Sequence, residues 1–154
     1  MPDIMPKERL LREVADAYER IIHSASEAAR RGVTRTDESW GPRELVAHLA
    51  GWEVMATVRV PKVAAGMPPL EFADEAQDAV MSDAINATIV AMAGDQSLEA
   101  ICCILRQAYQ RDIEMLRGLD ERFFQPGEYV YERTRGVIEH CQEHAEQLAP
   151  TRRG

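Results

Sequence analysis

The sequence predicts an all-α protein, a bundle of four long helices with one shorter connecting helix. Apolar residues recur at three- and four-residue spacing in several long segments, which is typical of amphipathic helices. Glycine and proline separate these segments, and no stretch of useful length alternates apolar and polar residues as a strand would. A chain of 154 residues is long enough to bury one core, so we expect a single domain over residues 1–154.

The first two long helices are predicted over residues 6–30 and from Pro42 towards Val60. Proline suits the first turn of a helix, as at Pro42, whereas Pro61 is expected to kink or end the second helix. The Gly-Met-Pro-Pro segment at 66–69 is a clear break. The apolar positions that repeat at helical spacing in the first segment are Leu10, Leu11, Val14, Tyr18, Ile21, Ile22 and Ala25.

The second half of the chain contains the connecting helix and two further long helices. The connecting helix is predicted over 74–93, and Ser97 opens the third long helix, which continues towards Leu116. Gly118 and the following Pro-Gly pair mark a long connection, after which the last helix covers 129–148. The long crossover between the second and third long helices permits a bundle that is not simply up-down-up-down.

Composition excludes several classes of function. The net charge is -8 and the pI is near 5.0, so a basic surface for nucleic acid is not expected. The first residues lack the apolar core of a signal peptide, and no run approaches the roughly 20 apolar residues that span a bilayer. The three cysteines are odd in number, which predicts a reducing, cytoplasmic location, and the adjacent Cys102-Cys103 pair is interpreted as buried small apolar residues.

Three histidines are the strongest functional signal. His140 and His144 lie four residues apart in the last predicted helix, so their side chains project from the same face. His48 lies in the second predicted helix. If it faces the pair, three imidazoles can hold one divalent metal ion and leave a coordination position open. One such pair alone also arises often by chance, so the prediction depends on whether His48 meets the other two.

Glu44 and Trp52 flank His48 at one helical turn on either side. Glu44 is a candidate to orient the imidazole or to line the same cavity, because ligating histidines usually have such an outer partner. Trp52 is about as well placed for a cavity wall as for the core. The fourth histidine, His23, has no such context and is expected on the helix surface, while Cys141 is expected in the core.

The histidine segments resemble a known family. Trp40-Gly41-Pro42-Arg43-Glu44-Leu45-Val46-Ala47-His48-Leu49 is similar to the Trp-x-x-[Lys/Arg]-[Asp/Glu]-Leu-x-x-His-Leu signature of the DinB/YfiT-like metalloenzyme superfamily. The segment from His140 to Leu148 resembles the closing helix of that superfamily, and Ile85-Asn86-Ala87 resembles its middle.

The resemblance implies a four-helix bundle with up-down-down-up connectivity and a homodimer. It implies a divalent metal ion, zinc or nickel, held by three histidines, which by position are His48, His140 and His144. In the mycothiol-dependent maleylpyruvate isomerase branch one ligand is a carboxylate, so this chain, with His140 there, looks more like the all-histidine branch. A second branch, the ClbS/DfsB-like self-protection proteins, shares the bundle without a clear need for metal.

These observations leave three hypotheses for function. The first is a transferase or isomerase that uses a low-molecular-weight thiol against a small electrophile. The second is metal-assisted hydrolysis, which needs a carboxylate base, and Glu44 is the candidate. The third is a small-molecule binding protein without catalysis. For the homodimer, the helix face that carries Leu11, Tyr18 and Ala25 is the candidate interface.

Overall fold

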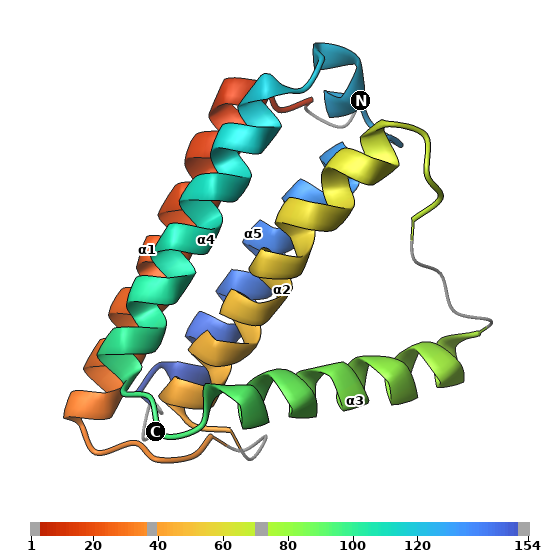
Figure 1. Ribbon diagram of the computed structural model, residues 1–154. Coiled ribbons are helices and arrows are strands. Elements are labelled where there is room, and N and C mark those ends of the chain that lie inside the picture. The colour runs from red at the N-terminus through yellow and green to blue at the C-terminus, as the bar shows by residue number, and fades with distance from the viewer. Residues whose placement is uncertain (1–3, 37–39, 70–73, 151–154) are drawn as a thin grey trace.

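The computed structural model describes residues 4–36, 40–69 and 74–150, and within them the chain is all-helical (Figure 1). Four of the helices pack side by side as a bundle, and another extends away from the end of that bundle (Figure 1). Among the described residues, no helix is long and apolar enough to cross a membrane. The helices are α1 (Lys7–Arg30), α2 (Pro42–Ala64), α3 (Glu75–Ala93), α4 (Leu98–Gly118) and α5 (Tyr129–Leu148), with a short 3-10 helix η1 (Glu121–Phe124) before α5.

Contacts between helix ends fix the directions of the bundle helices. Lys7, at the start of α1, donates a hydrogen bond to the carbonyl oxygen of Leu119, just after α4 (2.6 Å). Arg31, just after α1, donates to the carbonyl oxygen of Leu148 at the end of α5 (2.7 Å). Thus α1 runs antiparallel to α4 and parallel to α5. The colour gradient in Figure 1 shows that α2 runs parallel to α4.

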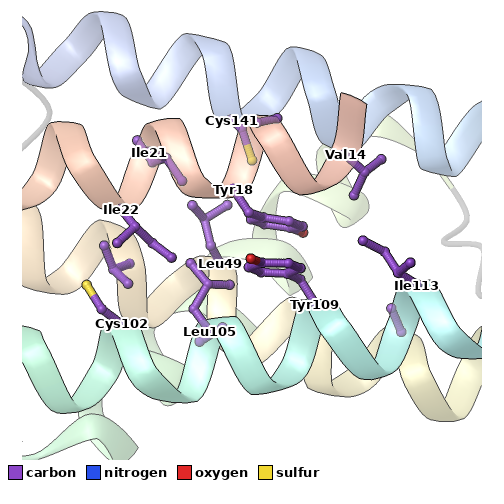
Figure 2. Close-up of a cluster of buried hydrophobic side chains, with 14 of the residues drawn as sticks. Val14, Tyr18, Ile21, Ile22, Leu49, Cys102, Leu105, Tyr109, Ile113 and Cys141 are labelled. Carbon is purple, nitrogen blue, oxygen red and sulfur yellow. The ribbon is translucent and has the colours of Figure 1, made fainter. Parts of the chain in front are cut away.

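The bundle core is one hydrophobic cluster to which α1, α2, α4 and α5 all contribute. Figure 2 shows its middle, where the rings of Tyr18 and Tyr109 stack with centroids 5.2 Å apart and planes 9° from parallel. Leu11, Tyr18 and Ala25 are at most 2% exposed. The expectation that they form a dimer face is therefore wrong, because the apolar stripe of α1 faces its own bundle. The homodimer itself stays a prediction.

The helix α3 is the predicted connecting helix. It has 19 residues and is the shortest of the five α-helices that the structure describes, as expected, although only one residue shorter than α5. Asp74 caps it by accepting a hydrogen bond from the Gln77 backbone N–H (2.8 Å). None of its described residues is buried, although Val80 and Met92 are large and apolar. This helix is therefore held mainly by its contacts with α2.

Two details of α2 matter for the site. The helix continues through Pro61 to Ala64, contrary to the expectation that it would end towards Val60. A proline so close to the helix end removes only one late backbone hydrogen bond, and a helix tolerates this. At Gly51 the helix meets α3 so closely that an added Cβ would lie 2.5 Å from the side chain of Ile89. Glycine at this position therefore allows α3 to approach the helix that carries His48.

Candidate metal centre

The structure brings the three predicted histidines together. His48 comes from the first half of α2, and His140 and His144 from the last turns of the antiparallel helix α5. The Nε2 atom of His140 lies 3.3 Å from that of His48 and 2.8 Å from that of His144. One ligand atom of each residue lies within 4.8 Å of the others, an arrangement that could hold a metal ion. The sequence prediction of a shared site for these residues agrees with this geometry.

Hydrogen bonding orients the ring of His144. Its Nδ1 donates to Oε1 of Gln147, 2.8 Å away and one turn later on α5. A neutral imidazole that carries its proton on Nδ1 has the lone pair on Nε2, which here points at His140. Three nitrogens that converge in this way repel one another unless a proton or a cation lies between them. The donor set therefore fits a divalent cation.

Burial keeps His48 and His140 neutral, which is the state that binds a metal ion. His48 is 5% exposed, and burial, together with the nearby rings of His140 and His144, lowers its pKa from 6.5 to about 4. Burial also lowers the pKa of His140 to about 4, and His144 adds to the shift. Both rings are therefore neutral near pH 7 and available as ligands.

A cavity of about 390 Å³ opens beside the histidines. Residues from α1, α2, α3 and α5 form its walls, and of the three histidines His48 and His140 line it whereas His144 does not. This volume lies within the range of cavities that hold small molecules. Its lining residues are Tyr18, His48, Leu49, Trp52, Glu53, Arg59, Ser82, Asn86, Arg133, Gly136, Val137 and His140.

Both tryptophans of the chain contact this region. Trp40 packs against the core, and its ring centroid also lies 5.2 Å from that of His48. Trp52 lines the cavity, as the sequence analysis allowed, and its Nε1 donates a hydrogen bond to Oδ1 of Asn86 on α3 (2.6 Å). Asn86 had no role assigned from the sequence. The signal that could have found it is a single polar amide in the middle of a largely apolar helix.

Glu44 does not reach the histidines. Its Oε2 accepts a hydrogen bond from the Gly41 backbone N–H (3.1 Å), and Oε1 lies 3.5 Å from the Arg43 guanidinium. Glu44 is the third residue of α2, where a glutamate folds back to cap the helix N-terminus. It does not line the cavity. The expectation that Glu44 orients the imidazole or acts as a base is thus wrong, because local capping uses the carboxylate.

The acidic group that does line the cavity is Glu53, which was not singled out from the sequence. Its carboxylate accepts hydrogen bonds from the Arg133 guanidinium (2.8 and 3.1 Å) and from the Tyr18 hydroxyl (2.5 Å). Arg133 also donates to Oδ2 of Asp112 (2.7 Å). Three helices besides α2 thus contribute to one buried network. A partial indication of this network was present in the sequence, because Arg133 lies on the same face of the last helix as His140.

The network has a defined charge state. Burial, together with the hydrogen bond and the charge of the neighbouring Glu53, raises the pKa of Asp112 to about 8 against the opposing effect of Arg133. For Glu53, burial acts to raise the pKa, but the charge of Arg133 and hydrogen bonds outweigh it and the pKa is lowered. Near pH 7 the arginine is therefore balanced mainly by Glu53, while Asp112 keeps its proton.

The remaining predictions for single residues have mixed outcomes. Cys141 is buried in the core and His23 is exposed, both as expected. Figure 2 shows the Cys141 sulfur directed towards Tyr18, within the apolar cluster. Cys102 is buried but Cys103 is exposed, so the interpretation of both as buried residues was wrong for Cys103. Adjacent residues on a helix point about 100° apart, and the core covers only one of them.

Comparisons of the chain with known proteins gave no match. No family model matches the chain, and neither a curated protein nor a solved structure matches it.

Proposed function

We propose that this protein is a DinB-like enzyme that depends on a divalent metal ion and transfers a small thiol to, or isomerises, a small electrophile. The observation that carries the proposal is the convergence of His48, His140 and His144 beside a cavity of about 390 Å³. The helix directions support the resemblance, since α1 and α5 run one way and α2 and α4 the other, as up-down-down-up connectivity requires.

The donor set suggests zinc or nickel. Three imidazole nitrogens suit these ions better than the oxygen-preferring magnesium or calcium. When bound, such an ion would lower the pKa of a thiol or water that it coordinates, so that the deprotonated form would be available near pH 7. His48, His140 and His144 would hold it, and Gln147 would fix the ring of His144.

Residues around the cavity favour an external thiol as the nucleophile. None of the three cysteines lines the cavity, so the chain supplies no thiol of its own there. Hydrolysis would need a carboxylate base, but Glu44 caps α2 and Glu53 is held by Arg133 and Tyr18. A carboxylate with a lowered pKa and two donors is a weak base. In thiol transfer, the S–H bond breaks and its proton goes to solvent, the sulfur forms the new bond to the electrophilic carbon, and the bond from that carbon to the leaving group breaks, so that the leaving group departs with the electron pair.

The first experiment is metal analysis of protein purified without a histidine tag. We expect about one zinc or nickel ion per chain in the wild type, and loss of that ion in His48→Ala and His144→Ala. His23→Ala is the matched control, because His23 is an exposed histidine on α1 and should leave the metal content unchanged. No metal in the wild type after reconstitution with zinc and nickel would overturn the proposal.

The second experiment separates the reaction classes. Metal-loaded protein is incubated with activated electrophiles, with and without a low-molecular-weight thiol. We expect turnover only with thiol, and none in His48→Ala. Turnover without thiol would indicate a hydrolase instead. Ligand binding without turnover in metal-free protein would indicate a binding protein of the kind that the ClbS-like branch represents.

A further inference from the structure

The charged residues that line the cavity are not all balanced. Glu53 and Arg133 line it as a direct ion pair with an N–O distance of 2.8 Å. Arg133 makes a second contact with Asp112, outside the lining. The third charged residue of the lining is Arg59, and it takes no part in this network. The cavity thus carries an excess positive charge, although the chain as a whole has a net charge of -8.

Arg59 has no hydrogen-bond acceptor or carboxylate partner among residues 4–36, 40–69 and 74–150. Its Nε is shielded from solvent and makes no hydrogen bond. The contact that it does make is with the ring of Trp52, whose centroid lies 5.8 Å from Cζ. A buried guanidinium N–H without an acceptor is costly, so a ligand that supplies an acceptor would be stabilised at this position. The aromatic contact holds the planar group in place for such a ligand.

Other parts of the cavity wall limit the shape of the ligand. Leu49, Trp52 and Val137 are apolar, whereas Ser82 and Asn86 offer neutral polar groups from α3. Walls of this kind suit a small organic body better than a hydrated inorganic ion. A carboxylate matches the fork of a guanidinium, which can donate two parallel hydrogen bonds to it.

We propose that this cavity binds a small organic anion, whose carboxylate pairs with Arg59 and whose apolar body lies against Trp52 and Val137. This inference rests on the proposed function in one respect, namely that the bound anion is the electrophilic substrate and presents its reactive carbon to the histidine end of the cavity. Binding of the anion through Arg59 is a property of the cavity that can be measured without turnover.

The test is titration calorimetry with benzoate and with its neutral counterpart benzamide. Both zinc-loaded and metal-free protein are used, because a carboxylate could also bind directly to zinc. We expect metal-free wild type to bind benzoate at least about tenfold more tightly than benzamide. Arg59→Met keeps much of the apolar stem and should lose this preference. Arg59→Lys should keep part of it, since the charge remains but the fork is lost.

Two controls decide what the titrations mean. Arg111→Met removes an exposed arginine of α4 that does not line the cavity, and it should bind benzoate like the wild type. Thermal unfolding of each variant excludes a folding defect. The inference is overturned if wild type does not bind benzoate, if benzoate and benzamide bind equally, or if Arg59→Met binds like wild type. Equal affinity for inorganic phosphate at the same site would also overturn it, because the organic body would then contribute nothing.

Metal analysis of the same samples separates this inference from the proposed function. Protein that holds no metal but binds benzoate through Arg59 would overturn the proposed function and leave the anion site in place. Protein that holds zinc at the histidines but whose binding of benzoate does not depend on Arg59 would overturn the anion site and leave the proposed function in place.

Discussion

The Nε2 atom of His48 lies 3.3 Å from the Nε2 atom of His140, although 92 positions separate the two residues in the sequence. Two antiparallel helices, α2 and α5, make this contact, and His144 joins it from the next turn of α5. Three imidazole nitrogens that face one another on packed helices form a preorganised site, because backbone packing and not the ligand sets their separation.

Gln147 should contribute to metal affinity without touching the metal. Its Oε1 accepts a hydrogen bond from the Nδ1–H group of His144 and thereby directs the Nε2 lone pair towards the other two histidines. We expect Gln147→Leu to weaken zinc binding by about tenfold or more, as the loss of such outer partners usually does. Competition with a chromogenic chelator measures the affinity. Gln142→Leu, at an exposed position of the same helix, is the control, and equal affinities in both variants would contradict this role.

Arg133 should be a major contributor to stability. Its guanidinium lies between two buried carboxyl groups, those of Glu53 and Asp112. Near pH 7, Arg133→Met would leave the Glu53 carboxylate buried without a counter-charge and would remove the hydrogen bond to the Asp112 carboxyl group. The loss of one partner of a buried ion pair typically costs about 3–5 kcal/mol. Urea unfolding of metal-free protein measures this loss. Arg9→Met removes one partner of an exposed pair with Glu13 and should cost less than about 1 kcal/mol. Similar losses in the two variants would argue against a buried network.

Asp112 should make the stability of the protein fall as the pH rises. Its pKa is about 8 in the folded chain, against roughly 4 for an unfolded aspartate. Between these values the folded state holds one more proton than the unfolded state, so this contribution is fully present below pH 4 and is lost as the pH rises through 8. The slope approaches about 1.4 kcal/mol per pH unit. His48 and His140 have the opposite sign, since their lowered pKa values make stability rise between pH 4 and 6.5.

Comparison of wild type with Asp112→Asn isolates this effect, because the histidine contributions are common to both. In metal-free protein, we expect the variant to gain stability relative to wild type as the pH increases from 5 to 8. Denaturant unfolding at several pH values measures the difference. Glu114→Gln, at an exposed carboxyl group on the same helix, should follow the wild-type curve. Parallel curves for wild type and Asp112→Asn would show that Asp112 is already ionised in the folded protein.

The helices were predictable because each amphipathic pattern is local, and the histidine pair of α5 was predictable for the same reason. The contact of His48 with that pair was an inference from the family resemblance, since no local pattern sets which helix faces which. The network of Glu53 could not be predicted, because Tyr18, Asp112 and Arg133 reach it from three other helices. Glu44 was misassigned because its position on the helix wheel carries no information on capping at the preceding glycine.

The position of α3 was likewise not predictable from a local pattern. Its apolar residues suggest a buried helix, but none of them is buried in the structure. Gly51 holds this helix near the histidine site, and a methyl group there would overlap Ile89. We expect Gly51→Ala to displace α3, to break the hydrogen bond between Trp52 and Asn86, and to cost about 1–3 kcal/mol. Hydrogen exchange should then be faster throughout α3, and the emission of Trp52 should shift to the red.

A second substitution tests whether steric overlap is the cause. Gly51→Ala combined with Ile89→Ala removes the atoms that the new methyl group would meet, so it should restore slow exchange in the part of α3 that contacts α2. Gly118→Ala is the matched control, because a Cβ there meets nothing within 4 Å. Unchanged exchange in Gly51→Ala would show that α3 is not held by this contact. The wall that α3 contributes to the cavity would then have to depend on its other contacts with α2, among them the hydrogen bond between Trp52 and Asn86.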